Sequence, residues 1–241
     1  MSDKETACFS PTFENGGYWE YYKDLERQFE SFLGYVPYLS GNEKIYSFRL
    51  ANLILSIGAH IDSALKEIVR YSEFSVKYPE MIKPKPSIID YFPISEIYDL
   101  PRRTIIFKRL PKRECILPFR EYVRQGNKLK TPFWWQVYNS IKHQFSENFK
   151  EANLENTRDS LAGAFLLNIF HVPAYVRLLE FHVITPHFQG ESSGNFILSS
   201  GWKEKQLAKG LTLNRLGVIE TSLFTYDFSE LNKTAGNQSS S

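Results

Sequence analysis

Cysteine is scarce in this sequence, and its scarcity excludes several classes of protein. Only Cys8 and Cys115 occur among the 241 residues, too few for a disulfide framework or a cysteine-based zinc cluster. Because disulfides are rare in reducing compartments, we expect a cytoplasmic protein. The segment Met1–Ser10 is polar and has no apolar run, so we also expect no secretory signal peptide.

Long hydrophobic runs are missing as well. The most apolar stretch, Leu161–Val176, is interrupted by Asn168, His171 and Pro173. It therefore falls short of the ~20 continuous apolar residues that span a bilayer. We expect a buried helix here and no membrane as a partner.

The usual signatures of cofactor and metal sites are absent too. The segment Ser193–Gly201 is glycine-containing, but it lacks the lysine and the following helix of a phosphate-binding loop. No G-x-S-x-G nucleophile elbow occurs. His171, His182 and His187 have no cysteine companions, and their spacing fits no standard zinc pattern. We expect neither a metal nor a cofactor.

What the sequence does have is apolar residues at helical spacing. Hydrophobic residues make up 42% of the chain, which is enough for a large core. A period of 3.6 residues predicts helices over Tyr18–Gly34, Asn42–Tyr71 and Thr131–Lys150. A further helix is expected to begin with Asn153 or Asn156 as its N-cap. The strongest apolar stripe consists of Leu50, Ile54, Ile57, Ile61, Leu65 and Ile68.

Prolines interrupt the helical pattern in the middle of the chain. They recur throughout residues 78–132 and forbid long helices there. Within this stretch Thr104–Phe107 and Cys115–Leu117 are predicted to be short strands, as are Asn195–Ser200 and Ser222–Phe228 near the C-terminus. We expect the C-terminal strands to complete a sheet that begins in the proline-rich stretch.

These patterns divide the chain into segments of different character. In order, they are residues 1–12, disordered; 13–77, a first helical half; 78–130, a basic proline-rich insertion with short strands; 131–184, a second helical half; 185–231, a C-terminal β/loop segment; and 232–241, a disordered tail. The predicted fold class is mainly α, a helical bundle with a small β-sheet.

The segment Phe133–Phe145 combines an apolar stripe with a row of polar residues. The stripe consists of Trp134, Tyr138, Ile141 and Phe145, and the row beside it of Trp135, Asn139, Lys142 and His143. Asp62 lies at the edge of the apolar face of its own predicted helix, where a carboxylate normally needs a partner. We expect Asp62 to accept hydrogen bonds from Lys142 or His143.

A carboxylate that orients an imidazole is the beginning of a general base. On this hypothesis the catalytic residues are Asp62, Tyr138, Asn139, Lys142 and His143. The alternative is structural, because buried polar groups at a helix crossing also satisfy one another by hydrogen bonds.

Positive charge is concentrated in one segment. Pro101–Lys130 holds ten basic and two acidic residues, a net charge of +8, which leaves −6 on the rest of a chain whose total is +2. Such a segment contacts a polyanion or docks on the chain's own acidic face. The residues that we expect to bind a nucleic acid are Arg102, Arg103, Lys108, Arg109, Lys112 and Arg113, with Trp135 as a stacking surface.

Two segments, "WWQVYNSIKH" (Trp134–His143) and "ANLENTRDSLAGAFLLN" (Ala152–Asn168), resemble the HEPN-like superfamily. In uncharacterised bacterial proteins of that kind, a W-x-x-Y-N-x-x-K-H helix precedes an A-N-L helix, with an acid-bearing helix upstream. The resemblance covers residues 42–71 and 131–183. It implies a homodimeric helical bundle that binds RNA in a stress or phage-defence setting, with an antitoxin or another protein as a further partner.

The superfamily contains ribonucleases and also non-catalytic helical modules. Its catalytic signature is an Arg, then a polar residue, with a His four to six residues after the Arg. His143 takes the place of that His and Asn139 that of the polar residue, whereas the Arg position falls on Tyr138, which cannot supply a cation. The resemblance thus implies RNA binding, with any cleavage by a metal-independent endoribonuclease of degenerate motif. The alternative is a non-catalytic binding or scaffold module.

Overall fold

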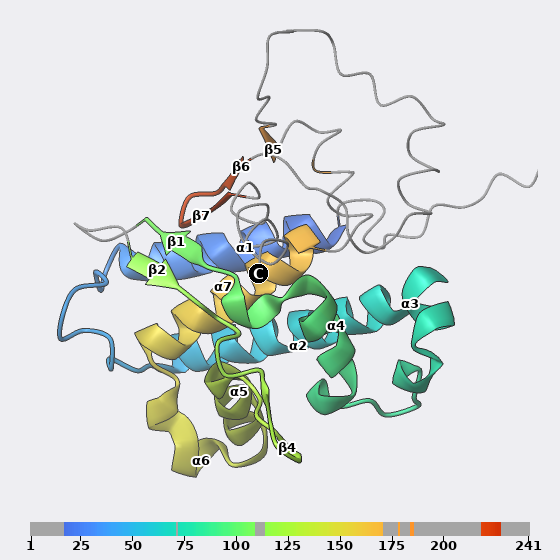
Figure 1. Cartoon of the computed structure of the whole chain (residues 1–241). Helices are drawn as coiled ribbons and strands as arrows, with labels where there is room; N and C mark the ends of the chain where they lie inside the picture. Colours follow the sequence, from blue (N-terminus) through green and yellow to red (C-terminus); the bar gives the residue numbers. More distant parts are fainter. Residues whose placement is uncertain are drawn as a thin grey trace, which may run out of the picture.

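The computed structural model describes residues 17–70, 72–108, 114–170, 178, 184–185 and 218–227. Within these ranges the chain is mainly helical, with a small antiparallel sheet beside the helices (Figure 1). The two expected disordered ends, the helical continuation past Pro173 and the expected strand Asn195–Ser200 lie outside the described residues. In the described part of the chain, no helix is both long and apolar enough to cross a membrane.

Four helices form the core. They are α1 (Gly17–Leu33), α2 (Phe48–Arg70), α5 (Phe133–His143) and α7 (Leu154–Phe170). Helix α2 packs against each of the other three, so it is the central helix of the bundle. Its predicted apolar stripe is confirmed, because all six residues of that stripe are at most 2% exposed.

Short elements connect the core helices. They are α3 (Ser72–Lys77), η2 (Pro79–Met81), η3 (Ile88–Tyr91), α4 (Phe92–Tyr98), η4 (Leu100–Arg102), α6 (Phe145–Asn148) and η5 (Phe149–Glu151). The proline-rich stretch thus contains only short helices, as expected, together with strands and turns.

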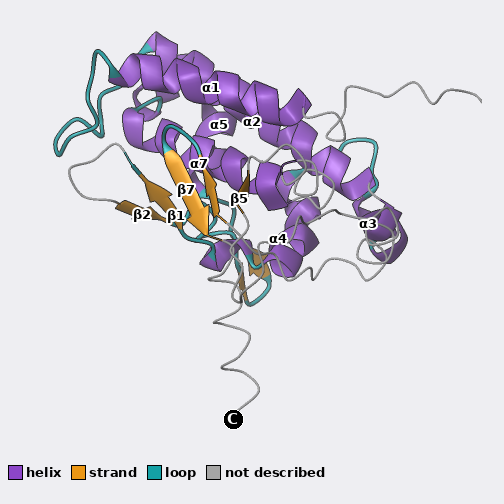
Figure 2. Cartoon of the chain, turned by 90° about the horizontal axis from the view of Figure 1, so that it is seen from above, coloured by secondary structure: helices purple, strands orange, loops and turns teal. Residues whose placement is uncertain are grey.

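The sheet joins distant parts of the chain. Its strand order is β2 (Glu114–Ile116), β1 (Ile105–Phe107), β7 (Phe224–Asp227), β6 (Val218–Glu220) and β5 (Ile184–Thr185), and the pairs are antiparallel. Figure 2 shows these strands gathered on one side of the helices. Because β1 pairs with β7, the expectation that a C-terminal strand completes the sheet is confirmed for Ser222–Phe228, whereas Asn195–Ser200 lies outside the described residues.

The sheet is fixed to α1 by one buried carboxylate. Oε1 of Glu26 accepts hydrogen bonds from the Tyr22 hydroxyl at 3.2 Å, from the Leu223 backbone N–H at 3.2 Å and from the Thr221 hydroxyl. Thr221 and Leu223 belong to the turn between β6 and β7. Burial raises the pKa of Glu26 above its usual range.

Two helix boundaries differ from the prediction. Helix α2 begins at Phe48, not at Asn42, because Ser47 caps it: Oγ of Ser47 accepts a hydrogen bond from the Leu50 N–H at 3.1 Å. The single helix expected over Thr131–Lys150 is broken at Gln144, whose backbone is not helical (φ −140°, ψ 61°).

The N-terminus of α7 resolves a choice that the sequence leaves open. Oδ1 of Asn153 accepts a hydrogen bond from the Asn156 N–H at 3.0 Å. Asn153 is therefore the N-cap of α7, and Asn156 lies inside the helix.

A second, two-stranded sheet lies immediately before α5. It is a hairpin of β3 (Arg124–Gln125) and β4 (Lys128–Leu129). Gly126 in its turn has φ +58°, a left-handed conformation that glycine adopts without steric cost.

Candidate functional site

A cleft of about 550 Å³ runs along α5, which we call the α5 cleft. Its walls come from α5, from α2 and from the segment that enters η3. The lining residues are Asp62, Pro86, Ser87, Ile88, Ile89, Thr131, Trp135, Gln136, Tyr138, Asn139 and Lys142. Four of the five predicted catalytic residues therefore share one cleft, and His143 is not among the lining residues.

Helix α5 can lie this close to its neighbours because each of them presents a glycine. A Cβ built on Gly58 of α2 would lie 2.2 Å from Cδ2 of Tyr138, and one built on Gly163 of α7 would lie 2.8 Å from Cζ2 of Trp134. Both aromatic rings thus rest directly on the backbone of another helix. This packing accounts for the two aromatic residues Trp134 and Tyr138 on α5, and it sets the position of the α5 cleft.

Asp62 does not make the expected contact across the helix crossing. Its carboxylate forms an ion pair with Lys66, one turn along the same helix. A partner at i+4 is already in reach on an isolated helix, so Asp62 needs no partner from α5. The expected bond from Asp62 to Lys142 or His143 is wrong for the described structure, and the carboxylate–imidazole pair of a general base is not assembled.

The polar side chains of α5 make local contacts. Nζ of Lys142 donates to the Tyr138 hydroxyl at 3.5 Å and lies 5.4 Å from the centre of the Tyr138 ring. Nδ2 of Asn139 donates to the Trp135 carbonyl at 3.0 Å, and Nε2 of Gln136 donates to the Thr131 carbonyl at 3.1 Å. These bonds use the amide nitrogens of Asn139 and Gln136, two residues that line the α5 cleft. They do not use the amide oxygens, which are hydrogen-bond acceptors.

The predicted polar row is not a buried structural network. Lys142 and His143 are exposed, because they lie in the last turn of α5, whose buried positions end at Ile141. Phe145, which we assigned to the apolar stripe, is only half-buried, since it follows the break at Gln144.

The expected stacking surface, Trp135, is buried. Trp134 and Trp135 are 3% and 7% exposed, and Nε1 of Trp134 donates to the Pro118 carbonyl at 2.6 Å. Neither ring has a free face on which a base could lie flat. Trp135 is nevertheless among the residues that line the α5 cleft.

Three of the predicted nucleic-acid contacts are engaged within the chain. Arg102 lies 3.9 Å from Asp99 and Lys108 lies 2.5 Å from Glu220. Nε of Arg103 donates to the Tyr98 carbonyl at 2.8 Å, and burial lowers the pKa of its guanidinium. This half of the basic segment therefore docks partly on the chain itself. Arg109, Lys112 and Arg113 lie outside the described residues.

The other half of the basic segment remains open to solvent. Arg120, Arg124, Lys128 and Lys130 are exposed, and none forms an ion pair within the described part of the chain. Three of them belong to the β3–β4 hairpin or its end, and Lys130 directly precedes Thr131 in the α5 cleft. The net charge of Pro101–Lys130 predicted a basic region, but it did not distinguish the cations that are engaged within the chain from those that are exposed.

Sequence reasoning missed a buried histidine on α2. His60 is 3% exposed, and its Nε2 lies 2.8 Å from Nδ2 of Asn168 on α7. Burial lowers the pKa of His60 to about 4. The imidazole is thus neutral. His60 is not part of the apolar stripe of α2, so the hydrophobic period gave no signal of its burial.

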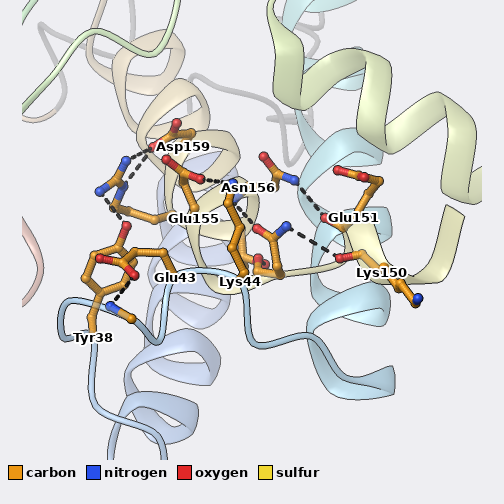
Figure 3. Close-up of polar contacts among 12 residues, drawn as sticks. Tyr38, Glu43, Lys44, Lys150, Glu151, Glu155, Asn156 and Asp159 are labelled. Atoms are coloured by element: carbon orange, nitrogen blue, oxygen red, sulfur yellow. Dashed lines mark hydrogen bonds and ion pairs between the residues drawn. The ribbon is translucent and has the colours of Figure 1, made fainter.

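A polar cluster around the start of α7 was also missed. Arg158 is buried and contacts Asp159 at 2.7 Å, Glu114 at 2.8 Å and the Tyr38 hydroxyl at 2.6 Å. In Figure 3, Lys44 points from the α1–α2 loop toward Glu155 on α7, at 2.5 Å. These contacts fix the loop and β2 to α7, and they commit the one arginine of α7 to a structural role away from the α5 cleft.

No group of three or more His, Cys, Asp or Glu side chains suited to a metal ion occurs in the residues that the structure covers. Comparisons of the chain with protein-family models, with curated proteins and with solved structures give no match.

Proposed function

We propose that this chain is a HEPN-like helical protein that binds single-stranded RNA along α5. The observation that carries the proposal is the run of exposed cations along the chain from the β3–β4 hairpin to the start of α5, namely Arg124, Lys128 and Lys130. None of them forms an ion pair in the described part of the chain, although the Arg124 guanidinium lies over the Phe92 ring, 5.3 Å from its centre. Cations in such a run contact successive phosphates and release their counterions, which is the main source of affinity for a nucleic acid. The helical bundle and the W-x-x-Y-N-x-x-K-H pattern of α5 support the HEPN-like assignment.

The α5 cleft offers groups for the bases. The amide oxygens of Gln136 and Asn139 accept hydrogen bonds from base amino groups, and Lys142 adds a cation at the far end of the cleft. Cleavage is not part of the proposal, because His143 does not line the cleft and no arginine does so. The homodimer and the stress or phage-defence setting rest on the resemblance.

The test is a salt titration of RNA binding, read by fluorescence anisotropy of a labelled 12-nucleotide single strand. Three or four phosphate contacts give a slope near −0.7 per contact in a plot of log K against log salt. Affinity should then fall roughly 20- to 50-fold between 50 and 200 mM salt.

A triple variant tests the location. Arg124→Gln with Lys128→Gln and Lys130→Gln should make the slope less negative by about 2. The matched control removes three cations elsewhere, on α1 and at the end of α2: Lys23→Gln, Arg27→Gln and Arg70→Gln. Absence of binding at 50 mM salt would reject the proposal and leave the non-catalytic scaffold module. If both triple variants change the salt slope equally, the RNA interface does not lie specifically at the hairpin.

A further inference from the structure

Four aromatic rings gather at the surface beyond the end of α5. Tyr46 lies in the loop before α2, and Phe48 is the first residue of that helix; Phe145 comes from α6 and Phe149 from η5. We call these four residues the aromatic platform. Phe48 is 68% exposed and Tyr46 is 43% exposed, while Phe145 and Phe149 are half-buried.

The rings of the aromatic platform pack on one another. The centroids of Phe48 and Phe149 lie 4.5 Å apart, and those of Tyr46 and Phe149 lie 5.3 Å apart. Phe48 and Phe145 lie 6.1 Å apart with only 14° between their planes. The break of the helix at Gln144 brings Phe145 and Phe149 to this surface. Their mutual contacts fix the rings in place while the face of Phe48 remains open to solvent.

An exposed cluster of this kind is comparable with the largest apolar patch of a typical monomer, and such patches are often functional. Its size argues against a second copy of the chain as the occupant. At ~200 Å² for a whole aromatic side chain, the exposed fractions amount to at most about 400 Å². A stable protein–protein interface needs about 800 Å² from each partner.

Size and chemistry both suit the bases of a single strand. Each stacked base needs only one ring face, and stacking tolerates any base. Exposed cations flank the platform: Lys142 before it, Lys150 after Phe149, and Arg49 beside Phe48, whose guanidinium also donates to Ser31 Oγ at 3.1 Å. Two acids, Glu147 and Glu151, lie on the same short helices. These cations neighbour the rings in the chain, but with two acids among them the surface is not uniformly basic.

The platform also continues the proposed RNA path. Lys142 lines the α5 cleft, and Phe145 follows it by three residues. A strand that leaves the cleft at the C-terminal end of α5 thus arrives at the rings. We infer that the aromatic platform stacks bases of the same single-stranded RNA that the α5 cleft binds, an inference that rests on the proposed function.

The experiment compares two probes of equal charge. One is a labelled 12-nucleotide RNA, and the other is a 12-unit abasic ribose-phosphate strand. Wild-type protein should prefer the RNA. Phe48→Ala should weaken binding of the RNA by about 5- to 150-fold, the effect of losing one stacked base, and should leave binding of the abasic strand and the salt slope unchanged.

Controls separate stacking from other roles. Tyr35→Ala removes a residue that is 81% exposed and that has no ring partner in the described part of the chain; it should change neither probe. Circular dichroism melts of Phe48→Ala test whether the variant folds. We expect it to fold, because Phe48 is largely exposed.

The outcomes are distinct. RNA binding that is equal for both probes and insensitive to Phe48→Ala would overturn the platform inference and leave the proposed function intact. If the protein binds neither probe, the platform inference and the proposed function are both overturned. A change of oligomeric state in Phe48→Ala, read by light scattering, would assign the platform to a protein interface and also overturn the inference.

Discussion

At the scale of single residues, burial separates the two histidines of the core helices. His60 on α2 is buried beside Asn168 and is neutral, whereas His143 on α5 is exposed. The sequence drew attention to His143 because it matched a pattern. His60 lies on a helix whose apolar stripe does not include it, so the sequence could not reveal that α7 covers it.

The depressed pKa of His60 predicts a pH dependence of stability. The native pKa is about 4, and that of the unfolded chain is about 6.5. Between these values the unfolded chain binds a proton that the native state does not, so the free energy of unfolding falls as the pH falls. At 1.36 kcal/mol per pKa unit, the loss from pH 7 to pH 4 is about 3 kcal/mol.

Urea unfolding followed by circular dichroism at several pH values measures this effect. His60→Gln should remove that part of the pH dependence, and His143→Gln should retain it. Carboxylates contribute equally to all three proteins, so they cancel in the comparison. A His60→Gln protein with the same pH dependence as wild type would contradict the prediction.

Asp62 illustrates how far the sequence carries at this scale. Its position at the edge of an apolar face was read correctly, and it does line the cleft with Tyr138, Asn139 and Lys142. The partner of Asp62 was predicted wrongly, because Lys66 on the same helix competes with the side chains of α5 for its carboxylate. Spacing along one helix predicts a shared face but does not decide between local and tertiary partners.

At the scale of elements, the helices were predicted better than their ends. Apolar periodicity and capping residues identified all four core helices, because the burial of whole helix faces leaves a clear pattern in the sequence. The boundaries at Ser47 and Gln144 depend on single caps and backbone angles, to which a hydrophobic period is insensitive. The break at Gln144 mattered most, because it moved Phe145 from the core to the aromatic platform.

The glycine contacts of α5 lead to a prediction for helix packing. Gly58→Ala places a methyl group within 2.2 Å of the Tyr138 ring, and α5 must shift to accept it. Overpacking of this kind costs about 1–3 kcal/mol, partly offset by up to about 1 kcal/mol from the better helix propensity of alanine. We expect a net destabilisation of about 1–2 kcal/mol and weaker RNA binding.

A double-mutant cycle isolates the contact. Tyr138→Ala removes the ring, so Gly58→Ala should cost less in that background than in wild type, by at least about 1 kcal/mol. Chemical denaturation of the four proteins supplies the numbers. Strict additivity of the two changes would show that the close approach is not what limits Gly58.

At the scale of the whole molecule, the sheet and the bundle are one folded unit. Strands from residues 105–116 and 218–227 meet in the sheet, and the ring of Phe165 on α7 lies 5.8 Å from that of Phe224 on β7. The sequence predicted β1, β2 and β7 and their association in one sheet, but it did not predict β5 or β6. The carboxylate of α1 that holds their turn was beyond sequence reasoning, because a lone glutamate in a helix is nearly always solvated.

Glu26 should therefore control the attachment of the sheet. Glu26→Ala leaves the Leu223 N–H and the Thr221 hydroxyl without their acceptor, at a cost of about 1–3 kcal/mol. Glu26→Gln keeps an oxygen at the same place and should cost less. Hydrogen exchange at the Leu223 amide reports the contact directly. Slow exchange of that amide in Glu26→Ala would contradict the assignment.

The strand order has a consequence for folding during synthesis on the ribosome. Strand β1 is complete at Phe107, yet its partner β7 begins only at Phe224. At a translation rate of ~5–20 residues per second, roughly 6–25 s separate the two. During that interval α5 and α7 are made and the bundle has all its core helices, while one edge of β1 still lacks its neighbour. An unpaired edge attracts other strands, so chaperone contact during synthesis should concentrate on this interval and end when β7 emerges.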